Sequence, residues 1–324
     1  KKEYLRLFEV FKAHNIKYFF YNGGGDSQDT TFKVSKMAKE LKLPLTCIGI
    51  PKTVDNDLPI TDCSPGFGSV AKYVATSTLE AGLDVKSMSE TSTKVFILEV
   101  MGRHAGWIAA ASALASTNET DPPHIILMPE VPFVKKKFID KVKQTVANEG
   151  FCVVVASEGT RYKNGMFLAD SGLTDAFGHK QLGGVAPVLA QMISSIGLKN
   201  HWAVSDYLQR SARHISSKTD LDQAYAVGKK AVEFALAGKN AVMPVIKRLS
   251  NKPYKWKIES ASLSKVANVE KTLPKGYISK DGFRVTSKGL DYLRPLIQGE
   301  TPISYKDGIP VVAQLKNILV KKIT

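Results

Sequence analysis

The feature that most constrains the fold is a regular alternation of short apolar runs with helical patterns along the first 240 residues. Runs rich in β-branched and aromatic residues predict strands, and apolar residues spaced three or four apart predict helices. Strands are expected at residues 17–21, 45–50, 94–101, 124–128, 151–156 and 201–207, and helices at 3–14, 27–41, 69–85, 103–116, 136–148, 182–196 and 221–237. This alternation predicts the α/β class, with parallel sheets covered by helices on both faces.

The region after Asn240 has a different pattern, with short strands and turns. Turns are expected at Lys252-Pro253, at Lys275-Gly276 and around Asp281, because Gly, Pro and Asp favour turn conformations. One further helix is expected at residues 287–297.

Composition places the chain among globular proteins of the cytoplasm. The 324 residues are 44% hydrophobic and 23% charged, and a length prior suggests about two domains. No apolar run approaches the roughly 20 residues of a membrane span, and the start does not resemble a signal peptide. The odd number of cysteines, Cys47, Cys63 and Cys152, favours reduced buried thiols over redox or metal chemistry.

The formal net charge of +15 is concentrated toward the end of the chain, where residues 251–324 contain 14 Lys and Arg against 6 Asp and Glu. Such a balance is compatible with a nucleic-acid-binding module. The basic residues alternate with acidic ones, however, and no nucleic-acid motif is present. A solvated basic surface that favours small anionic substrates is the preferred interpretation.

Four polar clusters follow predicted strands: 23–27, 52–57, 101–103 and 157–161. In open α/β sheets, ligands bind beyond the carboxyl ends of the strands. We therefore expect these clusters to contribute to one site, and the agreement of motif with topology is stronger evidence than any single cluster.

The first cluster, Gly23-Gly24-Gly25-Asp26-Ser27, opens a predicted helix. Glycines allow close approach of a ligand, and free N–H groups at a helix start favour phosphate oxygens. Ser27 is expected to cap the helix and to donate to phosphate. Asp26 suits an anion site only if a divalent cation bridges carboxylate and phosphate. A plain tight turn explains the glycines equally well.

The second cluster, Pro51 to Asp57, concentrates acid/base and anion-binding groups. Asp55 could accept the proton of an attacking hydroxyl, with Asp57 orienting that group or holding a metal. Lys52 could neutralise phosphate charge, and Thr53 could donate a hydrogen bond. Phosphoryl transfer needs little chemistry beyond these groups. The alternative is a solvated Asx-rich turn.

Other polar residues fit an anionic sugar. Arg103 is expected near a helix N-terminus, where a cation opposes the helix dipole unless an anion binds. Glu158 suits sugar hydroxyls, and Tyr207 with Arg210 suits a phosphate monoester. A surface ion pair for Arg103 and a local ion pair for Glu158 are equally compatible. His104 and Trp107 are interpreted as packing residues.

These motifs together resemble the 6-phosphofructokinases. The resemblance rests on Gly-Gly-x-x-Ser, on Pro-Lys-Thr-Val-Asp-Asn-Asp, on Met-Gly-Arg-His-Ala-Gly, on Pro-Glu-Val and on Tyr-Leu-Gln-Arg-Ser, in order and spacing, from about residue 3 to about residue 240. The tail, with residues 267–271 and 296–300, looks like that of the longer diphosphate-using members.

Two positions bear on the phosphoryl donor. ATP-using members usually have glycine where this chain has Asp26 and Lys52. A carboxylate at residue 26 would repel the α-phosphate of a nucleotide, and Lys52 would hold the leaving phosphate. The resemblance therefore implies a diphosphate-dependent enzyme of glycolysis and gluconeogenesis. It would convert fructose 6-phosphate and diphosphate reversibly to fructose 1,6-bisphosphate and phosphate, with Mg²⁺. The alternatives are an ATP-dependent 6-phosphofructokinase and an inactive sugar-phosphate-binding fragment.

The resemblance also implies residue roles. Asp55 would be the general base, with Lys52 and Arg103 as catalytic cations, Asp26 as the metal ligand, and Gly24, Gly25 and Ser27 as donor-binding residues. The substrate-binding set would be Thr53, Val54, Asp57, Lys94, Met101, Gly102, Glu158, His201, Tyr207, Leu208, Gln209 and Arg210. Lys94 and His201 stand where the family commonly has Arg from a neighbouring subunit, which implies a homodimer or homotetramer with shared active sites.

The same resemblance suggests a donor lobe at residues 1–90, a fructose 6-phosphate lobe at 91–240, and an extension at 241–324 that packs back on the donor lobe. Three departures matter. Gly25 replaces a family Asp that helps hold Mg²⁺, which moves that role to Asp26. His201 would bind phosphate well only if protonated. The family's first strand and first phosphate loop are expected upstream of Lys1.

Overall fold

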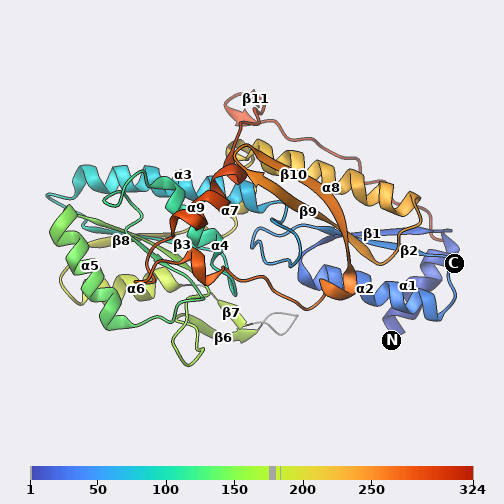
Figure 1. Ribbon diagram of the computed structural model, residues 1–324, viewed down its shortest axis with the longest axis horizontal. Helices are drawn as coiled ribbons and strands as arrows, with labels where there is room; N and C mark the ends of the chain where they lie inside the picture. The colour runs from blue at the N-terminus through green and yellow to red at the C-terminus, as the bar shows by residue number, and fades with distance from the viewer. Residues whose placement is uncertain (1, 175–179, 183, 324) are drawn as a thin grey trace.

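The computed structural model describes residues 2–174, 180–182 and 184–323. Figure 1 shows an elongated molecule with two halves, each containing a four-stranded sheet. The first elements are α1 (Lys2–Ala13), β1 (Tyr18–Gly23), α2 (Gly25–Glu40), β2 (Thr46–Pro51), α3 (Phe67–Met88), β3 (Val95–Val100), α4 (Trp107–Ala111), η1 (Ser112–Ala115), β4 (Ile125–Leu127), α5 (Lys135–Glu149) and β5 (Cys152–Ser157). They are followed by β6 (Asp170–Thr174), β7 (Lys180–Leu182), α6 (Val185–Ser194), β8 (Asn200–Val204), α7 (Leu208–Ser211), η2 (Arg213–Ile215), α8 (Lys218–Leu236), β9 (Val242–Asn251), β10 (Tyr254–Ser262), η3 (Leu263–Lys265), η4 (Lys275–Tyr277), α9 (Ser287–Leu293), η5 (Arg294–Ile297), β11 (Tyr305–Lys306) and β12 (Ile309–Pro310).

The second sheet is parallel throughout and has the order β4-β5-β3-β8. Side chains of a strand alternate between the two faces of its sheet. Val95 and Ile97 pack in one core with residues of α5 and α6, and Leu98 and Val100 pack in another with residues of α3 and α4. Helices therefore cover both faces, which confirms the predicted α/β class.

The first sheet has the order β1-β2-β9-β10 and mixes two directions. β1 pairs with β2 in parallel, and β9 pairs with β10 in antiparallel orientation. Cys47 packs on the α2 side of β2, and the next residue, Ile48, packs against Ala231 and Phe234 of α8. Helices α2 and α8 thus cover opposite faces of this sheet.

The expectation of only short strands after Asn240 was wrong. β9 and β10 have 10 and 9 residues and form a long hairpin around the expected turn at Lys252-Pro253. Much of this hairpin is partly exposed, so that Lys, Ser and Glu alternate with its apolar residues. This mixture weakened the apolar signal on which the prediction of strands relies.

The predicted helix at residues 103–116 begins later than expected. α4 begins at Trp107, and residues 101–106 form a loop. Gly102 has a φ of +128°, which an L-residue with a side chain rarely adopts, so the chain cannot be helical there. Arg103 consequently lies in this loop and not at a helix N-terminus, so the expected opposition to a helix dipole is wrong. The helix predicted at 182–196 likewise begins later, at Val185.

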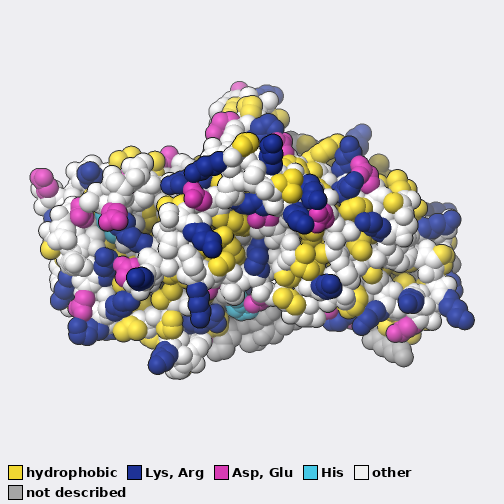
Figure 2. Space-filling view, viewed as in Figure 1, with side chains coloured by type: hydrophobic (Ala, Val, Ile, Leu, Met, Phe, Trp, Pro, Cys, Tyr) yellow, Lys and Arg dark blue, Asp and Glu magenta, His cyan; other side chains and the backbone are white. Residues whose placement is uncertain are grey.

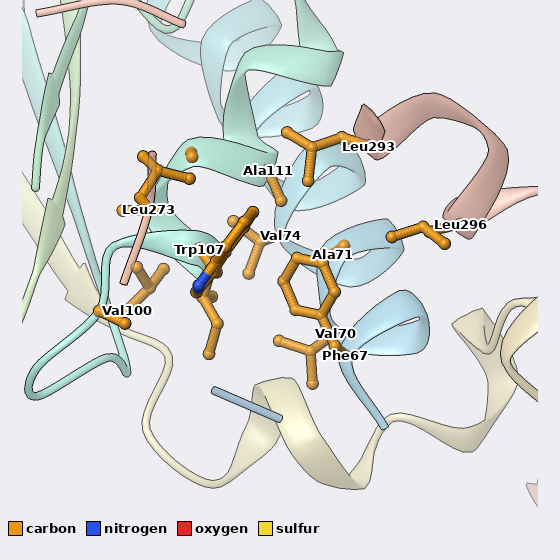
Figure 3. Close-up of a cluster of buried hydrophobic side chains, with 14 of the residues drawn as sticks. Phe67, Val70, Ala71, Val74, Val100, Trp107, Ala111, Leu273, Leu293 and Leu296 are labelled. Carbon is orange, nitrogen blue, oxygen red and sulfur yellow. The ribbon is translucent and has the colours of Figure 1, made fainter. Parts of the chain in front are cut away.

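The last part of the chain contributes residues to the hydrophobic cluster at the centre of the molecule. Leu273, Leu293 and Leu296 belong to the same hydrophobic cluster as Trp107 and Phe67 of α3, as Figure 3 shows. The helix predicted at 287–297 splits into α9 and the 3₁₀ turn η5 at Pro295, because a proline lacks the N–H that would continue the helix. The lobe boundaries at residues 90 and 240 remain a proposal, and α8, which precedes residue 240, covers the first sheet.

Three other expectations concern the surface and the thiols. The three cysteines are free and buried, as expected. Within the described ranges, no helix combines the length and the apolar character needed to cross a bilayer. On the face drawn in Figure 2, Lys and Arg are scattered among other residue types and form no continuous band.

Candidate active site

A pocket of about 570 Å³ lies where the carboxyl ends of β2 and β3 face the start of α3 and the α7–α8 region. The residues that line it include seven of the predicted site residues: Lys52, Thr53, Val54, Asp55, Met101, Gln209 and Arg210. Residues that are far apart in the chain therefore meet in one cavity, as the placement of the motifs at strand ends predicted.

Asp55 is partly buried in the wall of this pocket. Its backbone N–H donates to Thr53 Oγ1 at 3.2 Å, and the Thr53 hydroxyl is 3.5 Å from Asp55 Oδ2. Burial raises the pKa of Asp55 to about 7, helped by the negative charges of Asp57 and Glu158 and opposed by Thr53 and Arg103. A carboxylate with such a pKa can accept a proton near neutral pH and later release it.

Residues that do not line the pocket anchor the loop that carries Asp55. Asn56 is buried, has a φ of +54° and accepts a hydrogen bond from the backbone N–H of Ser64 at 2.9 Å. Asp57 does not line the pocket. Burial raises the pKa of Asp57, and its Oδ1 has no hydrogen-bond partner among the described residues. Of the two carboxylates of the motif, only Asp55 therefore lines the pocket.

The loops after β3 and β5 contact one another. Glu158 Oε1 accepts a hydrogen bond from the backbone N–H of Gly102 at 3.2 Å, and Ser157 Oγ donates to the carbonyl oxygen of Gly102. A Cβ atom at Gly159 would lie 2.0 Å from the carbonyl oxygen of Arg103, so only glycine fits there. Burial raises the pKa of Glu158, against the effects of Gly102 and Arg103.

The α7 segment joins this assembly through Gln209. This residue is buried, and its Oε1 accepts a hydrogen bond from the backbone N–H of Met101 at 3.3 Å. Arg210 lines the pocket, and its guanidinium stacks on the ring of Tyr207 at 4.0 Å. Tyr207 and Leu208 are 62% and 65% exposed and do not line the pocket in this chain.

The first cluster, Gly23 to Ser27, adjoins the Asp55 loop. A Cβ atom at Gly24 would lie 3.7 Å from Thr53 Cβ, and the backbone N–H of Lys52 donates to the carbonyl oxygen of Gly23. Gly24 is the N-cap of α2, which begins at Gly25. The expectation that Ser27 caps this helix was therefore wrong, because Ser27 already lies inside the first turn. Asp26 is exposed in that turn.

Two predicted residues lie away from the pocket. Lys94 precedes the amino end of β3, whereas the pocket adjoins the carboxyl end, and its Nζ donates to the carbonyl oxygen of Ser89. His201 is an exposed residue of β8, paired in register with Phe96. The structure places both at the opposite end of the second sheet from Asp55.

The interpretation of His104 as a packing residue was wrong, whereas Trp107 is packed. The His104 side chain is 36% exposed, and its Nδ1 is 2.7 Å from Glu270 Oε1. Trp107 is 2% exposed and lies in the central hydrophobic cluster. The motif alone does not distinguish these neighbours, because Glu270 comes from a segment far along the chain.

Sequence reasoning missed one buried carboxylate of the pocket. Asp220, at the start of α8, accepts hydrogen bonds from the backbone N–H groups of Gly66 and Ser69 and from Ser69 Oγ, at 2.9, 3.0 and 2.6 Å. It thereby satisfies the free N–H groups at the start of α3. Burial raises the pKa of Asp220. Ser217 and Asp220 have the spacing of a helix start, but nothing in the sequence indicates a contact with α3.

The described residues contain no group of three His, Cys, Asp or Glu side chains arranged to hold a metal ion. Magnesium, however, is commonly held by one or two carboxylates together with substrate phosphates. Asp26, exposed beside the glycine loop, fits a metal that arrives with a phosphate ligand.

Comparison with known proteins agrees with this geometry. The family model described as Phosphofructokinase matches residues 1–235. The pyrophosphate--fructose 6-phosphate 1-phosphotransferase of Halomonas elongata is 62% identical over 316 residues, which cover 97% of this chain and 75% of the relative. The protein of that name from Methylococcus capsulatus is 57% identical, with 99% and 77% covered.

Solved structures give the same result. The crystal structure of pyrophosphate-dependent phosphofructokinase from Marinobacter aquaeolei is 61% identical and superposes with a TM-score of 0.91. The superposition covers 99% of this chain and 78% of that one. The chain belongs to the phosphofructokinase family.

Proposed function

We infer that the protein transfers a phosphoryl group from diphosphate to the 1-hydroxyl of fructose 6-phosphate, giving fructose 1,6-bisphosphate and phosphate. The observation that carries this inference is the pocket in which Asp55, with a pKa of about 7, lies with Lys52 and Arg210 on its walls. The high identity to enzymes named for this reaction, over almost the whole chain, supports it.

The acceptor side of the reaction would depend on Asp55. Its carboxylate accepts the proton of the 1-hydroxyl as that oxygen attacks phosphorus, and the Thr53 hydroxyl next to it holds the carboxylate in place. Arg210 binds the 6-phosphate, since a guanidinium matches phosphate oxygens with paired donors. Glu158, which accepts a hydrogen bond from the N–H of Gly102, would also accept hydrogen bonds from the sugar hydroxyls.

The donor side would depend on the first two loops. Lys52 is exposed at the pocket wall and is available to neutralise the charge of the leaving phosphate. Gly24, Gly25 and Ser27 lie at the start of α2, where the backbone N–H groups favour phosphate oxygens. Asp26 would repel a longer nucleotide phosphate chain. Because diphosphate is a modest phosphoryl donor, the reaction is expected to run readily in both directions.

We propose Mg²⁺ as the divalent metal and Asp26 as the protein group that holds it. Bound there with diphosphate, the ion would reduce the repulsion between the phosphate oxygens and the incoming hydroxyl. Arg103 would contribute a further positive charge to the reaction, and its lowering effect on the pKa of Asp55 supports this role.

We also propose that two or more copies of the chain share active sites in the cytoplasm. His201 on β8 and Lys94, the residue before β3, lie at the same end of the second sheet, where β3 and β8 pair directly. β8 is an edge strand with Trp202 and Val204 48% and 38% exposed, and such an edge is suited to contact with another subunit. Each copy would then supply His201 and Lys94 to the pocket of its neighbour.

The activity is tested by incubating the purified full-length protein with fructose 6-phosphate and Mg²⁺, with either diphosphate or ATP as the donor. Formation of fructose 1,6-bisphosphate with diphosphate, and little with ATP, is the expected result. Turnover with ATP alone would overturn the choice of donor. Binding of fructose 6-phosphate in calorimetry without binding of diphosphate would favour the sugar-phosphate-binding fragment.

The shared site is tested by co-expressing two inactive variants, Asp55→Asn and His201→Ala. A mixed dimer contains one pocket with both native residues, so activity should return to a substantial fraction of the wild-type value. A mixture that stays as inactive as its components, although light scattering shows mixed oligomers, would refute the sharing of His201.

A further inference from the structure

The segment formed by residues 267–273, here called the crossing segment, runs between the two halves of the molecule. Figure 1 shows it in orange, from η3 beside α2 toward the half that contains the second sheet. At one end, Asn268 Nδ2 donates to Asp29 Oδ1 of α2 at 3.0 Å. At the other end, the backbone N–H of Leu273 donates to Glu130 Oε1 at 2.8 Å, and the Leu273 side chain packs near Trp107 (Figure 3).

Glu270 of the crossing segment holds the loop that precedes α4. Its Oε1 is 2.7 Å from His104 Nδ1. His104 directly follows Arg103, whose charge acts on Asp55, and lies in the same loop as Met101, which lines the pocket. The contact therefore connects the crossing segment to the loop proposed to bind fructose 6-phosphate.

Lys271, the next residue, holds the loop that carries the proposed base. Its backbone N–H donates to the carbonyl oxygen of Asp57 at 2.6 Å. Its Nζ donates to Asn56 Oδ1 at 3.3 Å, and to the carbonyl oxygens of Thr61 and Asp62 at 3.0 Å each. All four acceptors lie within seven residues of Asp55 in the chain, and the three that bind Nζ match the three donors of the ammonium group.

Further hydrogen bonds fix the position of Asn56 and of Lys271 itself. Asn56 Oδ1 also accepts from the backbone N–H of Ser64, and Asn56 Nδ2 donates to Tyr292 Oη at 3.0 Å. The carbonyl oxygen of Lys271 accepts from Trp107 Nε1 at 2.9 Å. The base loop, the crossing segment, α4 and α9 are thus joined by one continuous set of buried and partly buried hydrogen bonds.

Burying an ammonium group is unfavourable unless its donors are satisfied. Burial lowers the pKa of Lys271 to about 8, which reflects this cost. The lysine nevertheless makes three hydrogen bonds to oxygens of the base loop, and an apolar side chain would remove all three, although Asn56 Oδ1 and the Asp62 carbonyl oxygen would keep their hydrogen bonds from the Ser64 N–H and from Tyr292 Oη. Because burial of the Lys271 ammonium group is unfavourable, we interpret its hydrogen bonds as serving to fix the position of the base loop.

We propose that Glu270 and Lys271 are positioning residues for the reaction, which together hold the Asp55 loop and the Gly102–His104 loop at a fixed separation across the pocket. Neither residue lines the pocket. Glu270 acts on the sugar-phosphate loop through His104, and Lys271 acts on the base loop through Asn56 and Asp57. The proposal rests on the proposed function for its kinetic consequences but on the hydrogen bonds for its geometry.

Because the two residues act on different loops, their replacement should separate KM from kcat. Glu270→Ala is expected to raise KM for fructose 6-phosphate about five- to tenfold with kcat within about threefold, whereas Glu270→Gln, which keeps an acceptor for His104, should restore the wild-type KM. Lys271→Met is expected to lower kcat by roughly 10- to 100-fold with KM nearly unchanged, since small displacements of a reacting group cost that much. Lys265→Met is the matched control, because Lys265 is exposed in η3 and should leave both constants unchanged.

Hydrogen–deuterium exchange of the full-length protein tests the geometry without relying on turnover. In Lys271→Met, amides of residues 55–62 should exchange faster, and in Glu270→Ala those of residues 102–106 should do so, while α5 remains protected as in the wild type. Circular dichroism and thermal melting establish that each variant is folded. Glu270→Ala removes a half-exposed side chain and keeps the test valid if Lys271→Met fails to fold.

Unchanged exchange in these loops in the folded variants would overturn the proposal. So would kinetic losses in Glu270→Ala that Glu270→Gln fails to restore. If the wild type itself showed no turnover with diphosphate, the proposed function would fail, and the exchange experiment alone would still decide whether the crossing segment positions the loops.

Discussion

The backbone N–H of Gly102 donates a hydrogen bond to Glu158 Oε1 at 3.2 Å, which joins the loops after β3 and β5. The two residues are far apart in the sequence but follow neighbouring parallel strands, Val100 being in register with Ser157. Burial raises the pKa of Glu158, and its charge in turn helps raise the pKa of Asp55. This carboxylate therefore links the sugar site to the strength of the proposed base.

Glu158→Gln should change both properties. Loss of the charged acceptor should raise KM for fructose 6-phosphate several-fold, and loss of a negative charge near Asp55 should lower the pKa of Asp55. The low-pH limb of the kcat profile is then expected to move toward lower pH. Steady-state kinetics across pH 5–9 measure both effects. Glu149→Gln, an exposed change at the end of α5, is the control. An unshifted limb would contradict the proposed coupling to Asp55.

Asp55→Asn tests the base directly. The amide has nearly the same shape but cannot accept the hydroxyl proton, so kcat should fall by about 100- to 10,000-fold with KM changed little. Initial rates and binding of fructose 6-phosphate by calorimetry check the two parts separately. Retained turnover in a folded variant would remove Asp55 from the catalytic role.

The pH dependence of the wild type follows from the pKa of Asp55, which is raised to about 7. The base must be ionised, so kcat should decline as the pH falls below about 7 and level off above it. The decline should approach tenfold per pH unit if a single group is responsible. A profile that stays flat down to pH 5 would show that no group with this pKa controls the reaction.

The same pKa has an effect on stability. Folding raises the pKa of Asp55, so its ionisation opposes folding, and this cost appears as the pH rises from about 4 through 7. Asp55→Asn should therefore raise the free energy of unfolding at pH 8, by on the order of 2 kcal/mol, and have little effect near pH 4. Urea unfolding at the two pH values measures the difference. A gain that is equal at both would point to a cause other than ionisation.

The donor preference is tested by Asp26→Gly combined with Lys52→Gly. Removing the carboxylate relieves repulsion of a nucleotide phosphate, and removing the lysine weakens diphosphate binding. The ratio of kcat/KM for ATP to that for diphosphate is expected to rise at least tenfold. Lys143→Gly, at an exposed position of α5, should leave the ratio unchanged. If the ratio does not rise, residues 26 and 52 do not set the donor.

Gly102→Ala tests the conformation of the substrate loop. Its φ of +128° disfavours a side chain, and the new Cβ would lie 2.7 Å from the carbonyl oxygen of Ala105. The variant is expected to lose roughly 1–3 kcal/mol of stability and to bind fructose 6-phosphate more weakly. Gly228→Ala is the matched control, because the space around this helical glycine is open and alanine should stabilise α8 by up to about 1 kcal/mol. Equal stability of the two variants would contradict the strain at Gly102.

Most of the fold could be predicted because its signals are local. The runs at residues 45–50 and 151–156 are apolar because β2 and β5 are buried, and a buried strand needs apolar side chains wherever its neighbours lie. The predictions failed where the local signal was mixed. β9 and β10 are partly exposed, so their sequence predicted only turns and short strands. The alanines after Trp107 predicted a helix from residue 103, but with Gly102 and Gly106 before it the helix begins only at Trp107.

For the site, the sequence by itself determined the chemical groups and their order: the Asp55 carboxylate between Thr53 and Asn56, the glycines before Asp26, and Arg210 after Tyr207. Only the tertiary structure decided which of these groups meet. Asp220 accepts hydrogen bonds from N–H groups at the start of α3, and Glu158 accepts one from the N–H of Gly102. Lys271 donates to Asn56, the residue after Asp55. The physical reason is that the energy of a buried polar contact depends on burial and on the partner in space, and a partner more than 50 residues away leaves no periodic signal in the sequence.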